Sequence, residues 1–110
     1  MENRYYQGLA LKKLGRSEEA SRLFDELLQV GKELEGRADL DYFVKFGERQ
    51  SDPERLTRAH YLQGLGFLGR GQTESGKSEF RTVLGINASH LGARAGLAAL
   101  EEYPLAKISV

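Results

Sequence analysis

Two stretches decide the fold: YYQGLALKKLGRSEEASRLF at residues 5–24 and YLQGLGFLGRGQTESGKSEF at residues 61–80. They align at a shift of 56 residues, the difference between their first positions, 61 and 5. In each, a glycine is followed three residues later by a large apolar residue, seven later by a glycine, twelve later by a small residue and sixteen later by phenylalanine. The pattern predicts two copies of a pair of helices joined by a turn. The aligned positions include Tyr5 with Tyr61, Gly8 with Gly64, Leu9 with Leu65, Leu11 with Phe67, Gly15 with Gly71, Ala20 with Gly76, Phe24 with Phe80, and Leu28 with Leu84.

The small residues of this pattern indicate how the two helices of a pair pack. A small residue on each helix lets two antiparallel backbones approach closely, while large apolar side chains fill the space beside the contact. We therefore expect Gly8 to meet the second helix near Ala20, and Gly64 to meet its partner near Gly76. Gly15 is expected to end the first helix, because glycine tolerates the left-handed conformation that closes many helices.

This arrangement resembles the tetratricopeptide repeat, whose pattern has a small glycine, an aromatic residue three positions later, and then Ala-x-x-x-Phe. The matching residues are Gly8, Leu11, Ala20 and Phe24 in one copy and Gly64, Phe67, Gly76 and Phe80 in the other. Neither copy has the tryptophan or the final proline of the family pattern, and the spacing of 56 residues exceeds the family's roughly 34. The resemblance implies an all-α fold of about five or six helices, arranged as antiparallel hairpins in a right-handed superhelical array.

The helix-breaking and helix-capping residues between the apolar segments set the expected ends of the helices. Ser17 and Thr73 are the predicted N-caps of the second and fourth helices, and Asp52 that of the third, with Pro53 at its first position. Pro104 is expected to close the last helix. The expected layout is a single domain over residues 1–110, with repeat one at about 2–31, an insert at about 32–52, repeat two at about 53–87 and a capping helix at about 89–103.

The insert between the copies is too apolar for a flexible linker. Its apolar residues are Leu40, Tyr42, Phe43, Val44 and Phe46. One interpretation is an extra short helix that packs over the groove side of the repeats, because small repeat arrays need their exposed faces covered. The other is a functional loop that docks a partner, and both stay open at this point.

Composition narrows the classes of function. The chain has 16 Lys and Arg and 16 Asp and Glu, so its formal net charge is zero and no long-range field favours nucleic acid or an acidic membrane. It has no cysteine, and His60 and His90 have no second ligand at metal-binding spacing. No apolar run approaches the roughly 20 residues of a membrane span. We expect a cytoplasmic protein without cofactor, metal or enzymatic activity.

One motif matches a nucleotide-binding pattern letter for letter. Residues 71–78, GQTESGKS, satisfy the phosphate-binding pattern G-x-x-x-x-G-K-[ST]. That loop must leave a β-strand and open a helix, whereas the residues before Gly71 are helical by pattern. The internal alignment also gives Gly76 a packing role, as the counterpart of Ala20. Nucleotide binding is therefore not the expected function.

The resemblance implies a protein-binding or scaffolding module with an apolar groove for a peptide or partner protein. The expected groove residues are Tyr5, Leu9, Lys12, Tyr61, Leu65 and Leu68. Family members that grip a terminal carboxylate use Lys and Asn where this chain has tyrosine and leucine, so that mode is not expected. The alternatives are a non-catalytic accessory tail of a larger bacterial carbohydrate-related enzyme and a homodimer through unmatched repeat ends.

Overall fold

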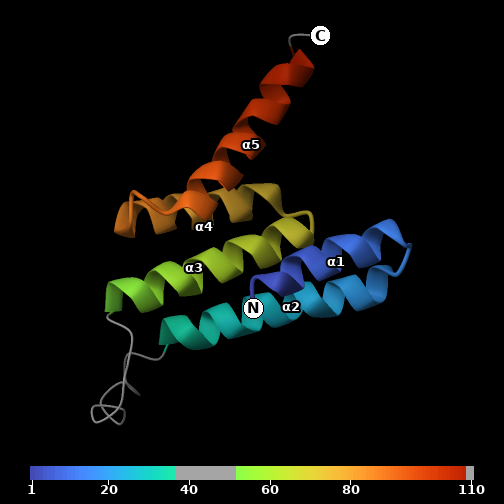
Figure 1. Ribbon diagram of the computed structural model, residues 1–110, viewed down its shortest axis with the longest axis horizontal. Helices are drawn as coiled ribbons and strands as arrows, with labels where there is room; N and C mark the ends of the chain where they lie inside the picture. The colour runs from blue at the N-terminus through green and yellow to red at the C-terminus, as the bar shows by residue number, and fades with distance from the viewer. Residues whose placement is uncertain (37–51, 109–110) are drawn as a thin grey trace.

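The computed structural model describes residues 1–36 and 52–108, with side chains as far as residue 101. These residues form five helices and no strand, which confirms the predicted all-α class (Figure 1). Most of the expected insert at about 32–52, including its apolar residues, falls on residues 37–51, which lie outside the described part of the chain. None of the described helices is long and apolar enough to cross a membrane. The helices are α1 (Asn3–Lys13), α2 (Ser17–Glu35), α3 (Asp52–Gly69), α4 (Thr73–Ile86) and α5 (Leu91–Ile108).

The turns after α1 and α3 have the same geometry, as the internal alignment predicts. Gly15 and Gly71 adopt φ values of 80° and 82°, in the left-handed region that a side chain disfavours. The next residue donates its backbone N–H to a carbonyl five positions back, from Arg16 to Leu11 over 2.9 Å and from Gln72 to Phe67 over 2.9 Å. This pair of hydrogen-bonded turns satisfies the carbonyl groups that end each first helix.

These tight turns also correct the predicted N-caps. Arg16 and Gln72 occupy the cap positions, and neither makes a side-chain capping hydrogen bond. Ser17 and Thr73 are instead the first residues inside α2 and α4. The reason is that each turn uses the residue after its glycine to close the preceding helix, so the following helix begins one position earlier than expected.

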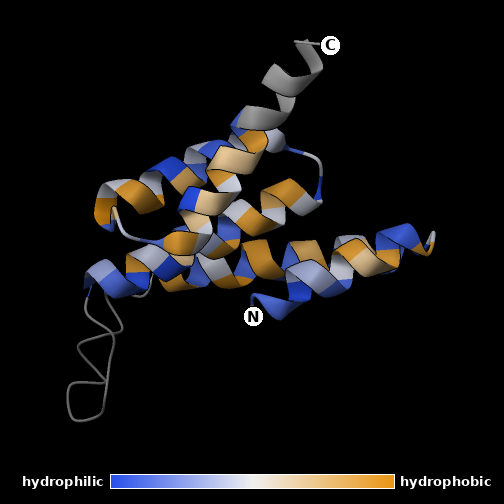
Figure 2. Ribbon diagram, turned by 45° about the horizontal axis from the view of Figure 1, so that its top comes forward, coloured by the Kyte–Doolittle hydropathy of each residue, from blue (hydrophilic) through white to orange (hydrophobic). Residues whose placement is uncertain are grey.

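Within each hairpin, a glycine of the first helix faces a phenylalanine of the second. A Cβ added at Gly64 would lie 2.5 Å from Cε1 of Phe80, and one added at Gly8 would overlap the ring of Phe24. Both rings are 1% exposed. A Cβ at Gly76 would lie 3.2 Å from the carbonyl oxygen of Gly64, so the expected close approach of these backbones is present. Figure 2 shows hydrophobic and hydrophilic residues interspersed along the coloured parts of the helices.

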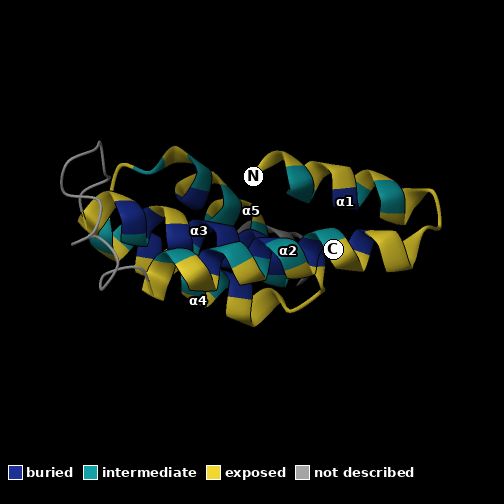
Figure 3. Cartoon of the chain, turned by 90° about the horizontal axis from the view of Figure 1, so that it is seen from below, coloured by how far each residue is buried: buried dark blue, intermediate teal, exposed yellow. Residues whose placement is uncertain are grey.

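A second glycine-lined contact, between α2 and α3, joins the two hairpins. A Cβ at Gly31 would lie 2.8 Å from the carbonyl oxygen of Ala59, and one at Gly66 would lie 2.9 Å from that of Phe24. Gly69 of α3 also packs directly against the Phe24 ring. Because α3 contacts α1, α2 and α4, most of its middle is buried, which Figure 3 shows as a dark run along the helix.

The last helix crosses α4 and then leads away from the two hairpins (Figure 1). Gly96 packs against Phe80, and Arg81 pairs with Glu101 at 3.4 Å. The expected end at Pro104 is wrong, because α5 continues to Ile108. Proline keeps a helical φ of about −65° and removes one hydrogen bond, so it costs stability without excluding a helical path.

Candidate functional site

A hollow in the described part of the chain lies between its first residues, the N-terminal half of α3 and the start of α5. Its volume is about 730 Å³. Segments far apart in the sequence build it, so it exists only in the folded protein. Its walls are formed by Met1, Glu2, Pro53, Glu54, Thr57, Arg58, Tyr61, Leu62, Ile86, Asn87, His90 and Gly92.

Tyr61 connects the three walls of this cavity. Its hydroxyl donates a hydrogen bond to Oε2 of Glu2 at 2.9 Å, and its ring centroid lies 4.6 Å from that of His90. On the α5 side, a Cβ added at Gly92 would lie 2.5 Å from the Tyr61 hydroxyl oxygen. Gly92 is therefore the residue that lets the start of α5 approach the phenol ring.

His90 has a defined role at the start of α5. Its Nδ1 accepts a hydrogen bond from the backbone N–H of Ala93 at 3.0 Å, which makes it a side-chain cap for that helix. A nitrogen that accepts cannot carry a proton, so the neutral ring carries its proton on Nε2. The Nε2–H group of His90 is thus a donor that the cap does not use, and the His90 ring lines the cavity.

The charged groups of the cavity walls differ in whether they have a partner among the described residues. Glu2 already accepts the hydrogen bond from Tyr61, and Glu54 also has an interaction of its own within the chain. Among the described residues, Arg58 has no hydrogen-bonding or ion-pair partner, and its side chain is exposed. Asn87 uses its side-chain oxygen to accept from the backbone N–H of Ser89 at 3.1 Å, which leaves its amide donor group.

Burial changes the acidity of two tyrosines near this region. Burial, and then the hydrogen bond to Glu2, raise the pKa of Tyr61 far above the ordinary value near 10. Burial, followed by the neighbouring Tyr6, raises the pKa of Tyr5. Both phenols are therefore neutral donors at physiological pH, and the Tyr61 hydroxyl binds Glu2 as a donor.

The six residues predicted from the sequence to line a groove lie in different surroundings. Tyr61 lines the cavity, whereas Leu65 is 4% exposed in the core and Leu68 packs against Gly76 between α3 and α4. Tyr5 packs on Phe24, with ring centroids 6.2 Å apart. Leu9 and Lys12 line a separate hollow beside α1, of about 500 Å³. Their part in partner binding stays a prediction, and only Tyr61 belongs to the larger cavity.

Sequence reasoning missed three donors of the cavity, Arg58, Asn87 and His90. The turn at residues 87–89 was expected. Nothing in the sequence indicates that His90 caps α5, because histidine is not a typical N-cap. Arg58 had no signal either, since an arginine on a helix is most often an ordinary surface charge. The cavity needs the start of α5 to lie against Tyr61 of α3, and spacing along the chain does not determine that contact.

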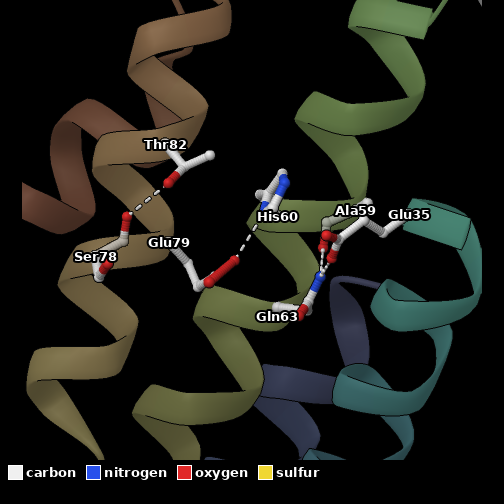
Figure 4. A network of polar contacts seen from close by, with 7 residues as sticks. All are labelled: Glu35, Ala59, His60, Gln63, Ser78, Glu79 and Thr82. Atoms are coloured by element: carbon white, nitrogen blue, oxygen red, sulfur yellow. Dashed lines mark hydrogen bonds and ion pairs between the residues drawn. The ribbon is translucent and has the colours of Figure 1, made fainter.

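The other histidine belongs to a polar network between helices (Figure 4). Nδ1 of His60 lies 2.7 Å from Oε1 of Glu79, and this contact joins α3 to α4. Next to it, the Gln63 amide donates to Glu35 at 2.8 Å and to the carbonyl oxygen of Ala59 at 3.3 Å. No cluster of three potential metal ligands occurs among the described residues.

The phosphate-binding pattern falls on a turn between helices. Gly71 follows α3, and Gly76, Lys77 and Ser78 lie inside α4. The ammonium group of Lys77 is 3.6 Å from the carboxylate of Glu74, on the same helix. The setting that the pattern requires, a loop that leaves a strand, is not what surrounds residues 71–78.

Comparisons with known protein families, with curated proteins and with solved structures gave no match.

Proposed function

We propose that this chain is a tetratricopeptide-type repeat module that binds a segment of a partner protein in the cavity between the chain start, α3 and α5. The observation that carries the proposal is the cavity itself, of about 730 Å³, with apolar and polar walls from three separate segments. Binding sites are typically concave, with mostly apolar walls and a few polar groups that fix orientation. The two hairpins with equivalent glycine turns support the repeat assignment.

The walls offer the two kinds of contact that a peptide needs. Met1, Ile86 and the methylene groups of Pro53 give apolar surface, and the donors of Arg58, Asn87 and His90 give polar contacts. Tyr61 in these walls is held by its hydrogen bond to Glu2 and by the close approach of Gly92. A preformed site of this kind avoids part of the ordering cost of binding.

The test is selection from a random peptide library on the intact chain, followed by affinity measurement on two variants. Arg58→Trp would fill part of the cavity from the exposed side of α3. Arg22→Trp is the matched control, because Arg22 is an exposed arginine of α2 that does not line the cavity. We expect the selected peptides to lose most of their affinity for Arg58→Trp only. Equal binding to both variants, or no selected peptide, would contradict the proposal.

The role as an accessory tail of a larger bacterial enzyme, and the homodimer, stay predictions. The parent reading frame would decide the first, and light scattering at several concentrations would decide the second.

A further inference from the structure

The acidic groups and the hydrogen-bond donors of the cavity walls differ in how far they already have partners among the described residues. The acidic ones are engaged within the chain: Glu2 accepts from Tyr61, and Glu54 has an interaction of its own. The donor groups are less engaged. The guanidinium of Arg58 has no partner among the described residues. Asn87 keeps its amide donors and His90 its Nε2–H, since their acceptor atoms are already bound to backbone N–H groups.

The start of α5 adds to the same imbalance. The N-terminus of a helix carries a partial positive charge, because its first backbone N–H groups have no partner within the helix. The first turn of α5 contains no acidic residue that would neutralise it. Gly92, in that turn, lines the cavity and has no side chain that would cover the backbone.

From this imbalance we infer that the cavity recognises an acidic side chain of the bound segment, with its carboxylate at the donors of Arg58, Asn87 and His90 and its apolar neighbours against Pro53 and Ile86. The inference rests on the proposed function and specifies the chemistry of the partner. Arginine suits this role, since its planar guanidinium can bind a carboxylate through two parallel hydrogen bonds.

A peptide fits these walls better than a nucleic acid. Binding to a phosphate backbone draws on many Lys and Arg contacts, whereas the described walls of this cavity contain one arginine, which has no partner among the described residues, and two glutamates. The chain as a whole has zero net charge. The apolar part of the cavity wall also suits an aliphatic side chain next to the acidic one.

The experiment measures how charge in the peptide affects affinity. Fluorescein-labelled peptides of about ten residues, identical except for Asp, Asn or Lys at one position beside a leucine, would be titrated into the intact chain, together with a single-stranded oligonucleotide of similar length. We expect the Asp peptide to bind at least about tenfold more tightly than the Lys peptide, and the difference to shrink as salt increases.

Two charge-reversal variants locate the preference. Arg58→Glu should remove the advantage of the Asp peptide and favour the Lys peptide, and Arg22→Glu, which makes the same change in net charge away from the cavity, should not. If library peptides bind in the cavity with no preference for acid, the inference fails and the proposed function stands. If no peptide binds there, both fail. Tighter binding of the oligonucleotide than of the Asp peptide would also overturn the inference.

Discussion

Gly64 and Gly85 show how differently two helical glycines can be used. At Gly64 a methyl group would lie 2.5 Å from a ring carbon of Phe80, whereas at Gly85 it would meet nothing within 4 Å. Since Phe80 is 1% exposed, its ring has no free space to move into. Gly64→Ala should therefore lower the free energy of unfolding by about 1 to 3 kcal/mol. Gly85→Ala should leave it unchanged or raise it by up to about 1 kcal/mol, because alanine favours helix.

Urea unfolding followed by far-ultraviolet circular dichroism measures both changes. Equal stabilities of the two variants would contradict the close packing of Gly64 on Phe80.

Tyr61 gives a prediction about alkaline pH. Its pKa is raised in the folded protein, so the unfolded chain releases this proton first as pH rises past about 10. The folded state then binds more protons than the unfolded state, and stability falls with increasing pH, by at most about 1.4 kcal/mol per pH unit for one group. Below the ordinary tyrosine pKa the contribution of Tyr61 is fully present.

Tyr61→Phe separates this effect from others. The variant should be less stable at neutral pH, because it loses the hydrogen bond to Glu2, yet its stability should fall less steeply between pH 9 and pH 11. Guanidinium unfolding at several pH values gives the slopes. A wild-type slope in Tyr61→Phe would show that this phenol does not titrate as expected.

At the residue scale, the sequence predicts the parts that repeat. Gly15 and Phe24 have counterparts in Gly71 and Phe80, and both pairs have the expected roles in the structure. The repeated pattern does not include Gly31, Gly66 and Gly69. These glycines nevertheless allow a similarly close contact between α2 and α3. The contact between hairpins depends on the crossing of two helices separated by the insert, and no periodicity encodes that crossing.

The end of α2 depends on a residue of the next helix. Arg55, at 5% exposure, donates through Nη1 to the carbonyl oxygens of Leu34 at 2.7 Å and Glu35 at 2.9 Å. The last carbonyl groups of a helix have no partner within it, so the guanidinium satisfies two of them. Arg55→Met should cost about 2 kcal/mol, because two part-buried hydrogen bonds from a charged group to the end of α2 are lost.

Arg81→Met is the control for Arg55→Met. Arg81 is exposed and pairs with Glu101 at 3.4 Å, so its loss should cost less than about 1 kcal/mol. Thermal unfolding of both variants measures the difference, and equal losses would rule out a special role for Arg55. Sequence spacing could not predict this cap, because the insert separates the arginine from the carbonyls it binds.

The start of α5 depends on His90 in a similar way. His90→Ala should remove the cap on the Ala93 N–H and cost about 1 kcal/mol, whereas His90→Asn restores an acceptor and should recover most of it. Hydrogen exchange at the Ala93 amide is the direct measurement. It should be faster than wild type in the alanine variant and near wild type in the asparagine variant, and no change in either would refute the cap.

For the whole molecule, Phe24 is the residue through which the two hairpins share one core. Its ring faces Gly8 of α1 and Gly69 of α3. The equivalent ring of the second hairpin, Phe80, faces Gly64 and the α5 residue Gly96. Hydrophobic burial therefore continues from the first hairpin through α3 to α5. The repeat alone predicts two equivalent hairpins, but the stability of each depends on the contact between them.

This dependence predicts a specific coupling between substitutions. Gly69→Ala should destabilise the protein, because its methyl group overlaps the Phe24 ring, but once Phe24→Ala has removed that ring the same change should cost little. Gly64→Ala, which meets Phe80 instead, should cost the same with and without Phe24→Ala. A double-mutant cycle by urea unfolding measures both pairs. An interaction energy below about 0.5 kcal/mol for the Gly69 and Phe24 pair would mean that the hairpins do not share this contact.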